Sequence, residues 1–118
     1  MFNELRFDAT CVNGCVVLAV RGEIDMATAP DLRSVIDRTI AASNHLTLDL
    51  NDVSFMDSAG VNVLVRAAAQ LDERGGTMQI VAASAPVTRL LELCGVAEFI
   101  GFRAAGVTSL GRASQAAS

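Results

Sequence analysis

The nucleophilic serine of many hydrolases lies at a sharp turn between a strand and a helix. The sequence predicts such a turn at Ser58. That nucleophile elbow needs a glycine two residues to either side; Gly60 is present, but Met56 stands where the first should be. The general base is the stronger test, because the only histidine, His45, precedes the apolar strand that leads toward Ser58. A strand of about six residues spans roughly 20 Å. We therefore expect His45 and Ser58 to lie toward opposite ends of a sheet and to form no catalytic pair.

Carboxylates are the second group of candidate catalytic residues. Asp25, Asp49 and Asp57 lie on or just after predicted strands and could converge at one edge of a sheet. General acid or base catalysis needs a carboxyl group in a dry pocket that raises its pKa. A chain with no Trp, no Tyr and five Phe offers little to build such a pocket, and the glycine spacings of phosphate-binding loops do not occur. We expect the protein not to be an enzyme and to use no cofactor.

Three cysteines, Cys11, Cys15 and Cys94, complete the reactive side chains. A low, odd count is typical of a reducing compartment. The Asn13-Gly14 pair is a strong signal for a two-residue hairpin turn, which pairs Val12 with Cys15 and directs the first two sulfur atoms to opposite faces. With one histidine in the chain there is no ligand set for zinc. We expect no metal site and interpret the cysteines as small buried hydrophobic residues.

The composition of the chain narrows its class. It has 118 residues, of which 52% are hydrophobic and 19% charged, as expected for one globular domain. All nine basic residues are arginine, and 13 acidic residues bring the net charge to −4, which disfavours nucleic acid and anionic membranes as partners. No apolar run approaches the ~20 residues that cross a bilayer, and the N-terminus lacks the pattern of a secretory signal. We expect a cytoplasmic protein.

Hydrophobic periodicity predicts the elements that position Ser58. Alternating or β-branched apolar runs predict strands over 4–10, 15–20, 46–50, 78–83 and 96–100. Apolar stripes at helical spacing predict helices that begin near Thr28, Ser58 and Pro86. A hairpin followed by alternating helices and strands predicts an α/β domain with a mixed sheet, whose strands are parallel after the first.

The strand over 46–50 indicates how the layers are arranged. Leucines at 46, 48 and 50 alternate with Thr47 and Asp49. A parallel strand covered on both faces reads as a continuous apolar run, so this alternation predicts helices mainly on one face. We expect the leucines to lie beneath the helices and Thr47 and Asp49 to face the other way.

The segment from Phe55 to Gly60 allows two interpretations. Asp57 and Ser58 are preferred N-cap residues, and Gly60 can permit close packing, so the turn can be purely structural. However, Phe55 and Met56 place two large apolar residues in a predicted loop before the polar cap. An apolar lip around a hydroxyl at a helix N-terminus is typical of a docking surface, and a helix N-terminus tolerates an added phosphate. Ser58 is therefore a suitable site for a reversible negative charge.

Several stretches of the chain, in this order and spacing, resemble the STAS domain of bacterial anti-sigma factor antagonists. They are Val20-Arg21-Gly22-Glu23-Ile24-Asp25, Thr28-Ala29-Pro30, 46–50, Phe55-Met56-Asp57-Ser58-Ala59-Gly60, Arg74-Gly75-Gly76 and Leu90-Leu91-Glu92-Leu93-Cys94-Gly95. The resemblance covers roughly residues 5 to 101. It implies a single STAS-like domain over 1–101, with a mixed sheet and helices mainly on one face, followed by 102–118 as a weakly ordered tail or short helix.

The resemblance also implies a partner surface. The family's Asp-Ser-Ser/Thr-Gly motif presents a serine to an anti-sigma factor that is also a protein kinase. By resemblance Ser58 is that serine and Asp57 its partner in the motif, while Ala59 replaces the commoner second hydroxyl residue. The partner-binding residues implied in this way are Glu23, Asp25, Thr28, Phe55, Met56, Asp57, Ser58, Ala59 and Gly60. Because parallel strands release their carboxyl ends at one sheet edge, we expect Asp25, Met56 and Ser58 to share a patch.

The function implied is that of an anti-sigma factor antagonist. In its unphosphorylated form it binds an anti-sigma factor with serine kinase activity and releases a sigma factor, and phosphorylation of Ser58 switches it off. A phosphoserine phosphatase is the second expected partner, and we expect a monomer or weak dimer. Two alternatives remain open. One is a structural STAS subunit of a stress-sensing or lipid-transport assembly in which Ser58 is only a helix cap, and the other is a small-molecule or nucleotide sensor that uses the same loops.

Overall fold

A two-residue turn at Asn13 and Gly14 joins the first two strands, β1 (Arg6–Val12) and β2 (Cys15–Ile24), in a computed structural model that describes residues 4–102. Both turn residues have positive φ, 52° and 80°, as a type I′ hairpin requires. Val12 pairs with Cys15 in the antiparallel ladder. The predicted hairpin and its register are therefore confirmed.

Two further strands, β3 (His45–Met56) and β4 (Thr77–Ala83), extend the sheet in parallel. The strand order in space is β1-β2-β3-β4, the same as in the chain. Among the described residues this is one mixed sheet, as the sequence predicts.

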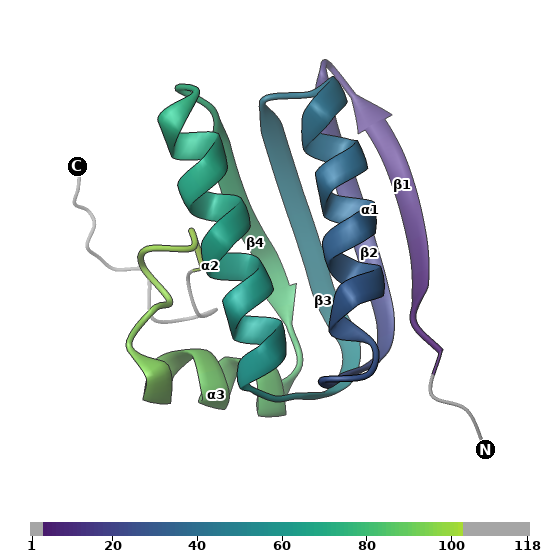
Figure 1. Cartoon of the computed structure of the whole chain (residues 1–118), viewed down its shortest axis with the longest axis vertical. Helices are drawn as coiled ribbons and strands as arrows, with labels where there is room; N and C mark the ends of the chain where they lie inside the picture. The colour runs from purple at the N-terminus through teal and green to yellow at the C-terminus, as the bar shows by residue number, and fades with distance from the viewer. Residues whose placement is uncertain (1–3, 103–118) are drawn as a thin grey trace.

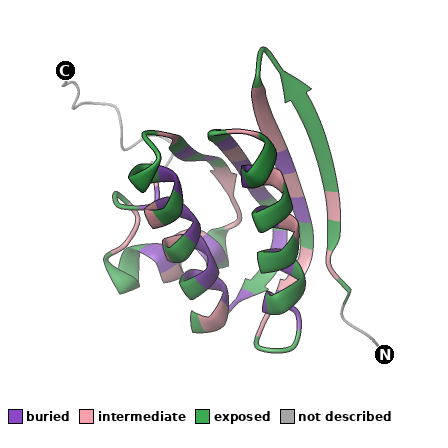
Figure 2. Ribbon diagram, turned by 45° about the horizontal axis from the view of Figure 1, so that its top comes forward, coloured by how far each residue is buried: buried purple, intermediate pink, exposed green. Residues whose placement is uncertain are grey.

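Three helices connect or follow these strands in the described range: α1 (Ala29–Ala42), α2 (Ser58–Glu73) and α3 (Ala85–Cys94). Figure 1 shows α1 and α2 side by side in front of the sheet, with α3 near the carboxyl end of β4. The leucines at 46, 48 and 50 are buried in the core under the helices, whereas Thr47 and Asp49 are only partly buried. Figure 2 shows the outer surfaces of the helices mostly as exposed and buried stretches between the helices and the sheet. Helices mainly on one face are thus confirmed.

β3 is longer than the predicted strand over 46–50, because it continues to Met56. Its alternation breaks at Asn51 and Asp52, which are both exposed, where its pairing with β2 shifts register. Beyond that irregularity Val53 and Met56 are buried again. The prediction that Phe55 and Met56 lie in a loop is wrong, since both belong to the end of a strand.

The predicted strand over 96–100 is also wrong. The chain forms a turn there, in which the Ile100 amide donates to the Val96 carbonyl over 3.0 Å. Gly101 then takes a φ of 79°, which leaves the strand conformation. Phe102 is buried and forms a single parallel bridge with Ile80, so the packed domain includes it. The rest of the tail predicted for 102–118 lies outside the described residues.

The cysteines are not the buried hydrophobic residues that the sequence suggests. Cys11 and Cys94 are exposed, Cys15 is partly buried, and all three are free thiols. Cys11 lies on β1, an outer strand whose side chains are mostly exposed, and Cys94 is the last residue of α3. The exposure of Cys11 and Cys94 therefore follows from their positions on an outer strand and at a helix end, although their neighbours in the sequence are apolar.

Candidate functional site

The carboxyl ends of β2 and β3 meet at one edge of the sheet. Ile24 pairs with Met56, and the next residue along, Asp57, donates its amide hydrogen to the Ile24 carbonyl over 3.1 Å. Asp25 and Ser58 therefore leave the sheet together. The prediction that Asp25 and Ser58 lie at one edge is confirmed, but Met56 is buried beneath that edge and does not share a surface patch with them. A role of these residues in partner binding stays a prediction.

Asp57 caps the helix that Ser58 begins. Its carboxylate accepts a hydrogen bond from the Ala59 amide over 2.9 Å, and its carbonyl accepts from the amides of Gly60 and Val61. Ser58, the first helical residue, is exposed, and no other described residue forms a hydrogen bond with its hydroxyl. Asp57 therefore caps the helix. The hydroxyl of Ser58 remains accessible at the positive end of the helix dipole.

Gly60 allows the first turn of α2 to approach the strand ends. A Cβ atom at this buried position would lie 2.7 Å from Ile24 Cγ2 and 2.7 Å from Met56 Cγ. Real Cβ atoms essentially never lie this close to other atoms, so an alanine here would force Ile24, Met56 or the helix to shift. The close packing predicted for Gly60 is confirmed, and Gly60 is buried.

The loop before α1 is fixed by Asp25 and Thr28. The Asp25 carboxylate accepts hydrogen bonds from the amides of Ala27 and Thr28, over 2.9 Å and 3.0 Å. In return, the Thr28 hydroxyl accepts from the Asp25 amide over 2.9 Å and donates to the Glu23 carbonyl over 2.7 Å. Thr28 is at the N-cap of α1 as predicted, but it is buried and makes no side-chain cap bond. Its role in this structure is to shape the loop.

The apolar side chains at this edge differ from the predicted pair. Phe55 is 46% exposed, but Met56 is only 5% exposed and belongs to the core. Met26, which the sequence analysis did not single out, is 80% exposed in the loop that Asp25 and Thr28 fix. A single methionine between a strand and a helix belongs to no periodic pattern, so the sequence does not indicate that Met26 is exposed. Its exposure is evident only from the structure of the loop. We call the side chains of Glu23, Asp25, Met26, Phe55, Asp57 and Ser58 the Ser58 edge.

His45 lies at the other end of β3. Its Nδ1 atom is hydrogen-bonded to the Thr77 hydroxyl over 2.9 Å, and its ring is exposed. β3 runs from His45 to Met56, and Ser58 follows that far end. The predicted separation of His45 and Ser58 is therefore confirmed.

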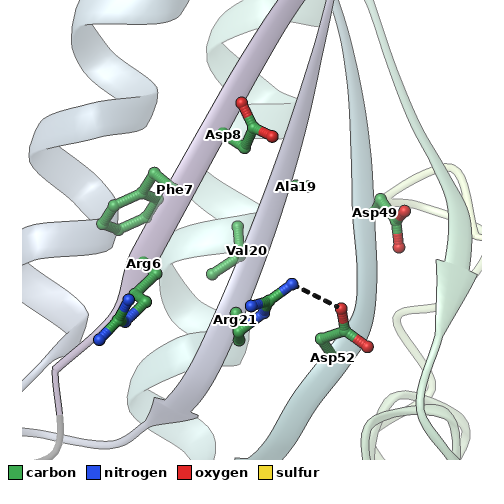
Figure 3. A pocket seen from close by; sticks show the side chains of 8 residues that line it. All are labelled: Arg6, Phe7, Asp8, Ala19, Val20, Arg21, Asp49 and Asp52. Atoms are coloured by element: carbon green, nitrogen blue, oxygen red, sulfur yellow. Dashed lines mark ion pairs between the residues drawn. The ribbon is translucent and has the colours of Figure 1, made fainter.

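A charged hollow of about 300 Å³ lies on β1, β2 and β3, and none of its lining residues belongs to the Ser58 edge (Figure 3). Asp8 and Asp49 flank Ala19 across three strands, and Arg21 forms an exposed ion pair with Asp52 over 3.6 Å. The complete lining is Arg6, Phe7, Asp8, Ala19, Val20, Arg21, Asp49 and Asp52. Asp49 therefore does not lie with Asp25 and Asp57, contrary to the prediction that the three carboxylates could converge. An exposed ion pair such as Arg21–Asp52 contributes little to the stability of the fold. The hollow is a solvated surface with both signs of charge.

Two further observations bear on chemistry within residues 4–102. No three His, Cys, Asp or Glu side chains there gather closely enough to hold a metal ion. None of the helices described is long and apolar enough to cross a membrane.

Comparison with known proteins gives a consistent group of relatives. A family model described as the STAS domain matches residues 6–108. An anti-sigma F factor antagonist from Paenibacillus polymyxa is 31% identical over 85 residues, covering 70% of this chain and 73% of that protein. An anti-sigma-B factor antagonist from Bacillus subtilis is 32% identical over 85 residues, covering 72% and 78%. The crystal structure of an anti-sigma factor antagonist from Mycobacterium paratuberculosis superposes with a TM-score of 0.75 at 29% identity, covering 83% and 84%.

Proposed function

Because the chain belongs to the STAS domain family of anti-sigma factor antagonists, we propose that it binds an anti-sigma factor with serine kinase activity and so releases a sigma factor. The anti-sigma factor binds the Ser58 edge while Ser58 is unphosphorylated. Phosphorylation of Ser58 by the bound kinase ends the interaction, and a phosphoserine phosphatase restores it. The protein is then the substrate of a kinase and not itself an enzyme.

The observation that carries this proposal is that Asp57, and not Ser58, caps the N-terminus of α2. In the alternative function, a structural STAS subunit, Ser58 serves only as a helix cap. The N-cap is Asp57, however, and its carboxylate takes the Ala59 amide. Ser58 is left with an exposed hydroxyl and no capping bond of its own. A serine in this state is suited to accept a phosphate from a partner.

The electrostatics of the edge support the direction of the switch. A phosphoserine carries about −1.5 to −2 charges at pH 7. In the free protein that charge sits at a helix N-terminus, where an anion is favoured by about 0.3–1 kcal/mol. In a complex, the same charge would be enclosed next to Asp57, the preceding residue, where desolvation and like-charge repulsion oppose it. Phosphorylation therefore preserves the fold and weakens binding.

Incubation with the cognate anti-sigma factor and ATP, followed by mapping of the phosphate by mass spectrometry, tests the proposal. We expect one phosphate on Ser58 and none on the Ser58→Ala variant. Ser54→Ala is a matched control, because Ser54 is an exposed serine four residues earlier that lies within β3 and not at a helix N-terminus. Phosphate on Ser54 instead of Ser58, or no phosphate on the wild-type chain, would overturn the proposal.

A further inference from the structure

Met26 is the most exposed large hydrophobic side chain in the described part of the chain, with 80% of its surface accessible. It does not lie in an unstructured stretch, because the backbone amides of the next two residues, Ala27 and Thr28, are both bonded to the Asp25 carboxylate. The loop therefore holds the thioether in water. Such a placement leaves apolar surface exposed in the free protein, and burial against a partner would remove it from solvent.

The position of Met26 links it to Ser58. Met26 follows the end of β2, and the Ile24 carbonyl at that end accepts the amide hydrogen of Asp57. Phe55, the other exposed apolar side chain of the Ser58 edge, pairs with Glu23 on the same two strands. Met26 and Phe55 are thus exposed apolar side chains on the two chain segments whose ends meet next to Ser58.

The methionines of the described chain differ sharply in accessibility. Met56 and Met78 are core residues with 5% and 8% of their surface exposed, against 80% for Met26. Oxidation follows exposure, because the oxidant must reach the sulfur atom. Hydrogen peroxide will therefore act on Met26 well before the two buried methionines.

We infer that Met26 is an oxidation-sensitive contact of the Ser58 edge, so that conversion of its thioether to the sulfoxide weakens binding of the anti-sigma factor. This inference rests on the proposed function. In the reaction the O–O bond of hydrogen peroxide breaks, one oxygen atom bonds to the Met26 sulfur, and the other leaves as water. The sulfur is oxidised by two electrons and the peroxide is reduced. A flexible apolar side chain becomes a polar one that is costly to bury in an interface.

The test compares the wild-type chain with Met26→Leu, which keeps an apolar side chain but cannot form a sulfoxide. Both proteins are treated with dilute hydrogen peroxide, incubated with dithiothreitol to reduce oxidised thiols, and titrated with the anti-sigma factor in the absence of ATP. Peptide mass spectrometry locates the added oxygen. Because both proteins keep Met1 and the three cysteines, any effect of those residues is common to both.

We expect oxidised wild-type protein to bind about tenfold more weakly, the factor that loss of one apolar contact produces, and treated Met26→Leu to bind as it did before treatment. Met26→Gln, a polar side chain of similar length, should bind as weakly as the oxidised protein without any peroxide. Unchanged binding by a protein oxidised at Met26, or an equal loss in Met26→Leu, would overturn the inference alone. Failure of the untreated wild-type chain to bind would overturn the proposed function together with it.

Discussion

The amide of Asp57 donates a hydrogen bond to the carbonyl of Ile24 over 3.1 Å. This bond joins the end of β2 to the turn that begins α2, and so connects the segment around Glu23 and Asp25 with Ser58. Some side chains at this edge hold the two segments in shape, whereas others only face solvent. Substitutions can therefore separate the two roles, if stability and partner binding are measured on the same variants.

Ser58→Glu should fold as stably as the wild-type chain and lose partner binding. The new carboxylate lies at a helix N-terminus, where the dipole favours it by about 0.3–1 kcal/mol. In the complex it would meet the Asp57 carboxylate in a desolvated interface, and a cost of about 2.8 kcal/mol corresponds to a hundredfold loss of affinity. Calorimetric titration with the anti-sigma factor measures this loss. Binding of Ser58→Glu at wild-type strength would contradict the switch, and Ser58→Ala should bind normally as the control.

Asp57→Ala should lower the free energy of unfolding by about 1 kcal/mol, the usual effect of removing an N-cap side chain. The physical reason is that the Ala59 amide loses its acceptor. Urea unfolding measures the change, with Ser58→Ala as the neighbouring control that removes no cap bond. If Ser58→Ala were the more destabilising of the two, the assignment of the cap to Asp57 would be wrong.

Asp25→Ala should destabilise the protein, whereas Glu23→Gln should not. The Asp25 carboxylate accepts two backbone hydrogen bonds in the loop before α1, and bonds to a charged group are worth about 1.5–3 kcal/mol. The Glu23 carboxylate forms no hydrogen bond with another described residue, and its contribution to the loop is its backbone carbonyl. Thermal unfolding of both variants checks this. A fall in the melting temperature of Glu23→Gln to that of Asp25→Ala would refute it.

Leu48→Ala should cost about 2–5 kcal/mol of stability, as for other large-to-small changes in a core. Leu48 is fully buried under the helices, and its neighbour Thr47 lies on the opposite face of the same strand. Thr47→Ala is therefore the matched control and should change the free energy of unfolding much less. Chemical denaturation of the two variants gives the comparison, and equal effects would argue against a core on one face.

Gly60→Ala should destabilise, although replacing glycine by alanine inside a helix normally gains about 1 kcal/mol. The added Cβ would lie 2.7 Å from atoms of Ile24 and Met56, both of which are core residues. Overpacking of this kind costs about 1–3 kcal/mol. A gain in the midpoint of urea unfolding would show that α2 can shift away from the strand ends at little cost.

The sequence predicts the elements of this fold well where one period persists. The strand over 46–50 and the apolar stripes of the helices each keep a single spacing, and the Asn13-Gly14 turn determines the hairpin register by its own backbone preference. The continuation of β3 beyond Asn51 was not predictable in this way, because the irregular pairing with β2 interrupts the alternation. The run over 96–100 looks like a strand but forms a turn, since its backbone bonds close locally from Val96 to Ile100.

The candidate site was predictable at Ser58 and Asp57, where motif and helix start coincide. Which apolar side chains surround them was not, because exposure depends on how two distant loops meet. Met56 turns inward since it continues the buried face of β3, and Met26 turns outward because the Asp25–Thr28 bonds fix the loop around it. The sequence contains both methionines but no local signal that distinguishes them.

The strands lie in space in the order in which they occur in the chain, β1-β2-β3-β4. Each strand after the first is therefore synthesised after the strand with which it pairs. β2 pairs with β1 directly through the hairpin, β3 pairs with β2 across α1, and β4 pairs with β3 across α2. No strand must wait for a later segment to be inserted between itself and its neighbour. The order of the strands is therefore compatible with extension of the sheet from its amino-terminal hairpin as the chain is synthesised.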